Sequence, residues 1–328
     1  MYHLTPGSHP LVFQSIACTL MGMSLACGRE PATHPAEMAL PPAQSVVDAE
    51  WSAPANLGPA INSSSNEQNA TLSRDGLSLY LTSDRPGGFG GLDIWVSNRA
   101  SLESSWNTAV NLGPTINTSG ADFAPNLSTD GHLLFFASVR AGGLGNSDVY
   151  LSQRSDVQND FGWGSPTLVA GVSSPDFDNA PMYRETVEES PVNFYFNRGV
   201  LALNQGEIYS AGLQRDGEVS SPPMPVVELN APGANDAAPS VRRDGKEVFF
   251  FSNRIGTAGA ADIWTSTRAS VHSPWSEPVN VGTSVNSAAG DVTPSLSFDG
   301  RILIFGSSRP GGIGGNDIWM STRFWPAQ

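Results

Sequence analysis

The stretch that decides the fold is SSRPGGIGGNDIWMS, residues 307–321 of a chain of 328 residues. Closely similar stretches occur at residues 82–95, 138–150 and 252–264. Each has an arginine, a glycine-containing run and an ending such as Asp-Ile-Trp or Asp-Val-Tyr. A pattern that returns at a regular spacing is the sequence signature of a repeat architecture. The chain is therefore predicted to consist of several copies of one supersecondary unit.

The positions of the Asp-Gly pairs give the number of copies. They begin at Asp75, Asp130, Asp244 and Asp299, with spacings of 55, 114 and 55 residues. Because the middle gap is two periods long, a degenerate copy is expected inside it. Residues 179–183, 194–198 and 207–210 match the expected strands of that copy. Five copies therefore fill residues 51–328.

Each copy is predicted to form four short antiparallel strands. The Asp-Gly pair joins the first two, because both residues of such a turn tolerate positive φ. The third strand follows the glycine-rich loop, and the fourth follows Trp106, Trp163 or Trp275. Units of four strands at this period predict an all-β, five-bladed propeller. Residues 51–58 resemble a fourth strand without its blade, so they are expected to complete the last blade and close the ring.

The repeats resemble the PD40 class of WD40-like β-propeller repeats, found in TolB and in envelope proteins linked to OmpA-like domains. The matching residues are Pro-x-Leu-Ser-x-Asp-Gly at residues 125–131 and 294–300, together with the glycine-rich loops. The resemblance covers the whole body of the chain. It implies a non-enzymatic binding or scaffold module that recognises an envelope protein on a propeller face. The chain has five copies where TolB has six, so TolB's own partner is not implied.

The arginine and the aspartate of the glycine-rich loop keep a constant offset of eight residues. Opposite charges that flank a hairpin loop can meet across it, and the carboxylate can also accept N–H bonds from the loop. A calcium site is the alternative, because the loop is similar to an RTX nonapeptide, but copies so far apart cannot stack to share ions. We therefore predict a structural clasp, a salt bridge between second and third strands, at Arg85/Asp93, Arg140/Asp148, Arg254/Asp262 and Arg309/Asp317.

A second polar position recurs where the innermost strands are expected to begin. Inner strands line the channel of a propeller, so these side chains should crowd one rim, where like charges require a cation or a basic partner. In the alternative, each aspartate bonds N–H groups of its own loop. This acidic rim is the predicted binding surface, and it comprises Asn69, Asp122, Asp178, Asp236 and Asp291.

Composition restricts the other classes of function. A net charge of −14 without clustered Lys or Arg argues against nucleic acid. A carbohydrate-binding or glycoside-hydrolase propeller, with a cell-wall glycan as ligand, is the alternative function. Repeat-equivalent aspartates do not supply the different environments that a catalytic acid and base need. His132 and His272 form no ligand-like pair, so no metal or cofactor is predicted. Trp51 and Trp325 are expected to pack between strands.

Residues 1–27 are predicted to be an export signal. Residues 11–26 are apolar and uncharged but shorter than a spanning helix. The following SLACG, residues 24–28, resembles a bacterial lipoprotein lipobox, which implies lipidation of Cys27; an ordinary cleaved signal is the alternative. The Pro- and Ala-rich residues 28–50 are predicted to form a flexible tether. The expected location is the outer membrane through a lipid anchor, or the periplasm or exterior.

Overall fold

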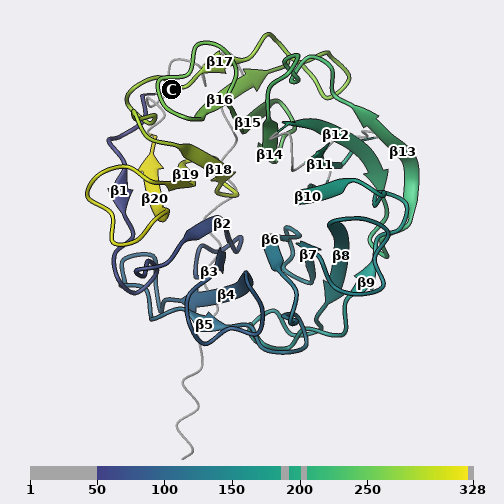
Figure 1. Cartoon of the computed structure of the whole chain (residues 1–328), viewed down its shortest axis with the longest axis vertical. Coiled ribbons are helices and arrows are strands. Elements are labelled where there is room, and N and C mark those ends of the chain that lie inside the picture. The colour runs from purple at the N-terminus through teal and green to yellow at the C-terminus, as the bar shows by residue number, and fades with distance from the viewer. Residues whose placement is uncertain (1–49, 186–191, 201–204, 324–328) are drawn as a thin grey trace, which may run out of the picture. The chain divides into compact units, whose positions relative to one another are not determined.

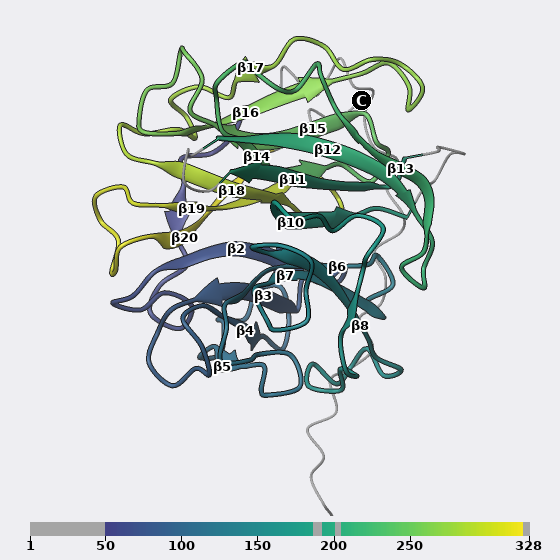
Figure 2. The same ribbon diagram turned by 45° about the vertical axis from the view of Figure 1, so that its right-hand side comes forward.

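The computed structural model describes residues 50–185, 192–200 and 205–323. In these residues the chain forms five sheets, each of four antiparallel strands. The sheets stand around a common centre (Figure 1, Figure 2). The predicted all-β propeller of five blades is therefore confirmed. The same residues contain no helix that could cross a lipid bilayer. The expected leader and tether, Cys27 and Trp325 lie outside the described residues.

Each blade places one strand at the centre of the ring (Figure 1). These inner strands are β2 (Glu67–Leu72), β6 (Asp122–Leu127), β10 (Phe177–Tyr183), β14 (Asp236–Val241) and β18 (Asp291–Leu296). The second strands are β3 (Ser78–Ser83), β7 (Leu133–Ser138), β11 (Phe194–Val200), β15 (Glu247–Ser252) and β19 (Ile302–Ser307). Each second strand follows its inner strand in the chain and pairs with it.

The outer half of each blade holds two more strands. The third strands are β4 (Asp93–Asn98), β8 (Asp148–Gln153), β12 (Gln205–Leu213), β16 (Asp262–Thr267) and β20 (Asp317–Thr322). The outer strands are β5 (Val110–Asn111), β9 (Thr167–Leu168), β13 (Val219–Pro225), β17 (Val279–Asn280) and β1 (Ala55–Asn56). Four outer strands are only two residues long, shorter than predicted. A short outer strand leaves little free edge for pairing with another chain.

The fifth blade takes its outer strand from the beginning of the described chain. Ala55 pairs with Met320 and Asn56 with Trp319. The guanidinium of Arg323 lies 4.7 Å from the ring centre of Trp51. The same stack joins Arg99 with Trp106 at 4.3 Å, Arg154 with Trp163 at 4.4 Å and Arg268 with Trp275 at 4.1 Å. Trp51 therefore packs as the fourth-strand tryptophan of the fifth blade, as predicted.

Every inner strand has a bulge in the middle, and the bulge residue has a left-handed conformation. The φ values are 49° at Asn69, 54° at Ala124, 48° at Ala180, 52° at Ala238 and 50° at Thr293. The strand pairing shifts at the same point in each blade. Positive φ is unfavourable for alanine and threonine, so surrounding contacts must hold it in four of the blades, whereas asparagine tolerates it. One such contact is the N–H of Ala124, which donates to Thr82 Oγ1 of the preceding blade at 2.9 Å.

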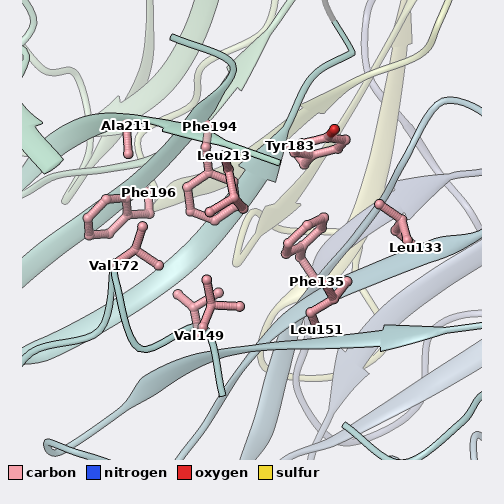
Figure 3. Close-up of a cluster of buried hydrophobic side chains, with 11 residues drawn as sticks. Leu133, Phe135, Val149, Leu151, Val172, Tyr183, Phe194, Phe196, Ala211 and Leu213 are labelled. Carbon is pink, nitrogen blue, oxygen red and sulfur yellow. The ribbon is translucent and has the colours of Figure 1, made fainter. Parts of the chain in front are cut away.

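The hydrophobic core lies between neighbouring blades. Figure 3 shows the cluster that joins the second and third blades. The ring of Phe135 on β7 lies 5.0 Å from that of Tyr183 on β10 and 5.4 Å from that of Phe194 on β11. All three side chains are at most 5% exposed. The aromatic-rich second strands therefore bind each blade to the next.

The two faces of the ring differ in their loops. Neighbouring strands in a blade run in opposite directions. The loop between second and third strands therefore lies at the same end as the connection into the next inner strand. We call the end with these loops the glycine-loop face. The Asp-Gly turns lie at the opposite end, which we call the turn face.

Candidate functional site

In every blade an arginine forms an ion pair with the carboxylate at the start of the inner strand; in four blades it belongs to the glycine-rich loop, and in the third it is Arg198 of β11. In the second blade, Arg140 Nη2 lies 2.7 Å from Asp122 Oδ1, and the side chain of Asp122 is 0% exposed. The other pairs are Arg85–Glu67 at 3.0 Å, Arg198–Asp178 at 2.6 Å, Arg254–Asp236 at 2.5 Å and Arg309–Asp291 at 2.5 Å. The predicted salt bridge between this arginine and the loop aspartate is therefore wrong.

The sheet register explains the correction. Ser138 pairs with Asp122 on one side and with Asp148 on the other. The guanidinium of Arg140 turns back over Ser138, donating from Nε to Ser138 Oγ at 2.8 Å. It can therefore reach either carboxylate. Asp148 accepts N–H bonds from Leu144 and Gly145 of the loop instead, at 2.8 and 3.1 Å.

Each arginine has further partners that hold it in place. Arg140 Nη2 donates to Ile116 O at 2.6 Å, in the loop that precedes the inner strand. The guanidinium also lies 4.7 Å from the ring centre of Tyr150 and 5.0 Å from that of Phe136. Charge, hydrogen bonds and ring contacts therefore join three parts of a blade at one side chain. The arginine therefore has a structural role, because it connects the inner strand, the second strand and the loop that precedes the inner strand.

The loop aspartates hold the glycine-rich loops closed. Asp93 Oδ2 accepts the N–H of Phe89 at 2.6 Å, and Oδ1 accepts that of Gly90 at 3.3 Å. Asp148, Asp262 and Asp317 accept the corresponding bonds. The N–H part of the prediction is therefore confirmed. Burial raises the pKa of Asp93, against the opposing effect of these N–H bonds. The described residues contain no group of carboxylate, His or Cys side chains that could hold a metal ion.

The glycines let the loop pack against the next blade. A Cβ on Gly90 would lie 1.8 Å from Gly120 O, in the loop before the second blade. A Cβ on Gly88 would lie 1.7 Å from Asp93 Oδ2. Beside this contact, the N–H of Asp122 donates to Leu92 O at 2.8 Å. The glycine-rich loop is thus a joint between blades as well as a hairpin between strands.

The predicted acidic rim is not an exposed surface. Asp122, Asp178, Asp236 and Asp291 are each 0% exposed and paired with arginine. Burial raises the pKa of Asp178, while Arg198 and Ser174 lower it. The carboxylates also accept bonds from their own preceding loops. Asp122, for example, accepts the N–H and the hydroxyl of Thr118 at 2.6 and 2.8 Å. The geometry therefore agrees with the alternative given above, in which each aspartate accepts N–H bonds from its own loop.

Asn69 was assigned to the wrong position of the first blade. Glu67 is the residue that opens β2 and pairs with Arg85. Asn69 stands two residues later, at the bulge position that Ala124 and Thr293 occupy in their blades. The longer glutamate side chain fills the place of an aspartate. The spacing could have identified it, because Glu67 lies 55 residues before Asp122, the same distance that separates Asp236 from Asp291.

The centre of the ring is narrow and lined by uncharged side chains. The space there is about 40 Å³, a volume of one or two water molecules. It is bordered by the bulges and the residues that follow them, among them Asn69, Thr71, Asn126, Met182 and Ser240. Some of these polar groups are already bonded, since Asn126 Oδ1 accepts the N–H of Tyr183 at 2.9 Å. The space between the bulges is therefore large enough for water.

Large apolar side chains are exposed at the tips of the glycine-rich loops, a feature that the sequence prediction missed. Phe89 is 50% exposed, Leu144 53%, Ile313 46% and Ile255 101%. The signal was present in the sequence, because three of the four glycine-rich loops carry Phe, Leu or Ile between two glycines. Ile255 instead follows Arg254 directly, at the position of Pro86 and Pro310. Local bonds hold these tips, as the Asp93 and Asp317 contacts show. The tips are the candidate functional surface.

A recess accompanies the tip of the fourth blade. It has a volume of about 510 Å³ and lies where the glycine-loop face meets the outer edge of that blade. Ile255, Trp264 and Pro278 contribute apolar surface to it, and Glu277 contributes a carboxylate. Residues 231–234, in the connection into β14, close the other side. The recess is large enough for an amino-acid side chain or a small ligand.

Comparison with known proteins identifies the fold. No protein-family model and no curated protein matches the chain. The α-L-arabinofuranosidase from Lactobacillus brevis is similar over 81% of this chain and 92% of its own, with 15% identity and a TM-score of 0.54. Arabinanase Arb43A from Bacillus subtilis is similar over 82% of this chain and 97% of its own, with 13% identity and a TM-score of 0.54. A putative TolB from Agrobacterium tumefaciens is similar over 79% of this chain and 78% of its own, with 19% identity and a TM-score of 0.45. At these identities the similarity to the arabinofuranosidase and the arabinanase shows the fold alone.

Proposed function

We propose that this protein is a non-enzymatic binding module of the bacterial cell envelope, of the TolB-like propeller type. It recognises a protein partner on its glycine-loop face. The observation that carries the proposal is the exposure of Phe89, Leu144, Ile255 and Ile313 on this face. The four side chains lie on four different blades but at the same end of the ring, so one partner that spans this face could contact several of them. The loops that present them are held by buried aspartates, so little conformational entropy is lost on binding.

The centre of the ring supports binding over hydrolysis. A glycosidase needs two carboxyl groups roughly 5–9.5 Å apart that face the sugar. In this protein the carboxylates nearest the centre, such as Asp122 and Asp291, are buried in ion pairs with Arg140 and Arg309. The channel itself presents amides, hydroxyls and small apolar groups. A carbohydrate-binding or glycoside-hydrolase propeller is the second candidate, favoured by the fold that the chain shares with arabinofuranosidases.

The leader supports an envelope location within the same proposal. Residues 24–28, SLACG, place Cys27 where a lipoprotein carries its lipid. The Pro- and Ala-rich residues 28–50 would then connect the anchor to the propeller. Radiolabelled palmitate should enter the wild-type protein and not the Cys27→Ala variant. Equal labelling of both, or of neither, would remove the anchor from the proposal.

The test of the binding function is a pull-down from detergent-solubilised envelopes. The variant replaces Phe89, Leu144, Ile255 and Ile313 by serine. A matched control replaces four apolar residues that are exposed elsewhere, Leu102, Val110, Phe161 and Val279. We expect a stoichiometric partner that binds the wild type and the control but not the tip variant. Retention of every partner by a folded tip variant, or release of arabinose from arabinan by the wild type, would overturn the proposal.

A further inference from the structure

The glycine-loop face combines its apolar tips with exposed carboxylates. Asp84 follows β3, Asp176 precedes β10, Glu207 lies at the start of β12, and Glu228 precedes β14. All four side chains are exposed. Partial burial works against ionisation of Asp84, but hydrogen bonds from the backbone and side chain of Asn66 outweigh it and lower its pKa. Asp84 is therefore charged at neutral pH.

The cations of this face are already engaged. In the described residues they are the five arginines of the Arg–carboxylate pairs, whose side chains are between 10% and 20% exposed. Each is directed to a buried carboxylate of its own blade. The other described Lys and Arg residues lie at the opposite strand ends or in the turns there, for example Arg74 and Arg243 beside Phe298. The glycine-loop face therefore carries an excess of negative charge: the five Arg–carboxylate pairs balance, while the loop aspartates and the exposed carboxylates add to them.

The recess of the fourth blade shows the same combination at a smaller scale. Ile255 is fully exposed at its border, and Trp264 and Pro278 form apolar walls. The exposed Glu277 supplies an anionic group beside them. A long side chain with an aliphatic stem and a positive end matches this surface, because its stem can contact apolar walls while its charge stays near a carboxylate.

We infer that the segment of the partner that docks on the glycine-loop face is a basic peptide segment with interspersed aliphatic side chains. Its aliphatic side chains contact Phe89, Leu144, Ile255 and Ile313, and its Lys or Arg groups face the exposed carboxylates. One such side chain enters the recess beside Ile255 and Glu277. This inference rests on the proposed function and specifies the chemistry of the partner. Complementary charge selects this partner over an acidic or a purely apolar one.

The experiment uses three fluorescent twelve-residue peptides as probes: alternating Lys-Leu, alternating Lys-Ser and alternating Glu-Leu. Fluorescence anisotropy measures their binding to the folded wild-type protein. We expect the Lys-Leu peptide to bind best and the Glu-Leu peptide not to bind. Binding should weaken by about tenfold or more between low and high salt, because the Debye length falls from about 30 Å at 0.01 M to about 3 Å at 1 M.

Two charge-neutralised variants decide whether the face is responsible. The first changes Asp84 and Asp176 to Asn and Glu207 and Glu228 to Gln. The second removes the same charge from exposed residues of the turn face, with Glu103→Gln, Asp156→Asn, Asp216→Asn and Glu218→Gln. We expect the first to weaken Lys-Leu binding by about tenfold and the second by less than about twofold. Circular dichroism and thermal unfolding verify that both variants fold.

The possible outcomes separate this inference from the proposed function. Equal weakening by both variants would mean that the net charge of the whole chain attracts the peptide, which overturns the inference. Equal binding of all three peptides does the same. If an envelope partner is lost with the serine tip variant but is retained by the first charge variant, the proposed function stands and the inference fails. If neither variant loses a partner, both fail.

Discussion

The third blade keeps the inner half of the repeat and changes the outer half. Arg198 still pairs with Asp178 at 2.6 Å, and Asn230 still bonds to the backbone of Ile208. Its outer strand β13, however, has seven residues where the other blades have two. Glu207 is exposed where the other blades bury an aspartate.

The difference separates what the ring requires from what a blade can vary. The inner pair joins three parts of a blade and removes two charges from water together, so every blade needs it. The outer strand pairs with only one other strand, so its length can change, although Val219 of β13 also packs against the core cluster between the second and third blades. The prolines of β13, Pro222, Pro223 and Pro225, have no N–H, which limits pairing along this longer free edge.

The most severe test of this comparison removes the inner carboxylate from a regular blade and from the third blade. Asp122→Asn and Asp178→Asn each leave a largely buried arginine without its ion-pair partner. We expect each to lower the free energy of unfolding by about 3–5 kcal/mol, measured by urea denaturation. Asp156→Asn, on the exposed turn face, is the control and should change it by less than about 0.5 kcal/mol. A mild effect of Asp178→Asn alone would mean that the third blade is held by other contacts.

A glycine substitution tests the joint between blades. Gly90→Ala places a Cβ 1.8 Å from Gly120 O, so the backbone must move, and we expect a loss of about 1–3 kcal/mol in thermal or chemical unfolding. Gly91→Ala is the matched control, since no atom lies within 4 Å of its Cβ. In the third blade the Cβ of Gly206→Ala meets Asn235 Oδ1 at 2.7 Å, a longer distance and a side-chain atom in place of a backbone oxygen. A smaller loss is expected there; an equal one would show that this blade's joint is equally rigid.

The smallest expected effect on the free energy of unfolding concerns a buried tyrosine whose position in the second blade is occupied by phenylalanine. Tyr80 donates to Asp160 at 2.9 Å and accepts from Arg154 at 3.0 Å, while the second blade has Phe135 at this position. Tyr80→Phe should cost about 1 kcal/mol at neutral pH, measured by urea denaturation.

The same variant has a pH signature. Burial and the nearby Asp160 raise the pKa of Tyr80 above the value of about 10 in the unfolded chain. The neutral phenol therefore stabilises the fold below about pH 10, and that contribution is lost as the pH rises further. The free energy of unfolding should fall less steeply above pH 10 in Tyr80→Phe than in the wild type. Parallel curves would exclude Tyr80 as a source of alkaline instability.

Much of the fold could be predicted from sequence because its signals are local. The Asp-Gly turns, the aromatic second strands and the glycine-rich loops each specify a few neighbouring residues, and their recurrence counted the blades. The outer strands were predicted too long, since the segment after Trp106 is held mainly by bonds such as Ser97 Oγ to Asn107 O. Asn69 was misplaced because Glu67, a different residue type, fills the aspartate position.

The sequence by itself determined the architecture of this protein, namely a five-bladed propeller with a glycine-rich hairpin in four blades. Only the tertiary structure decided what its charges do. Arg140 stands eight residues before Asp148, yet it pairs with Asp122, eighteen residues before it, because Ser138 brings both carboxylates within reach. The partner of a long side chain depends on which strands lie beside it and which groups are already bonded. For the same reason the aspartates of the predicted acidic rim are buried and paired with arginine. The side chains that are exposed on this face include the apolar residues of the glycine-rich loops.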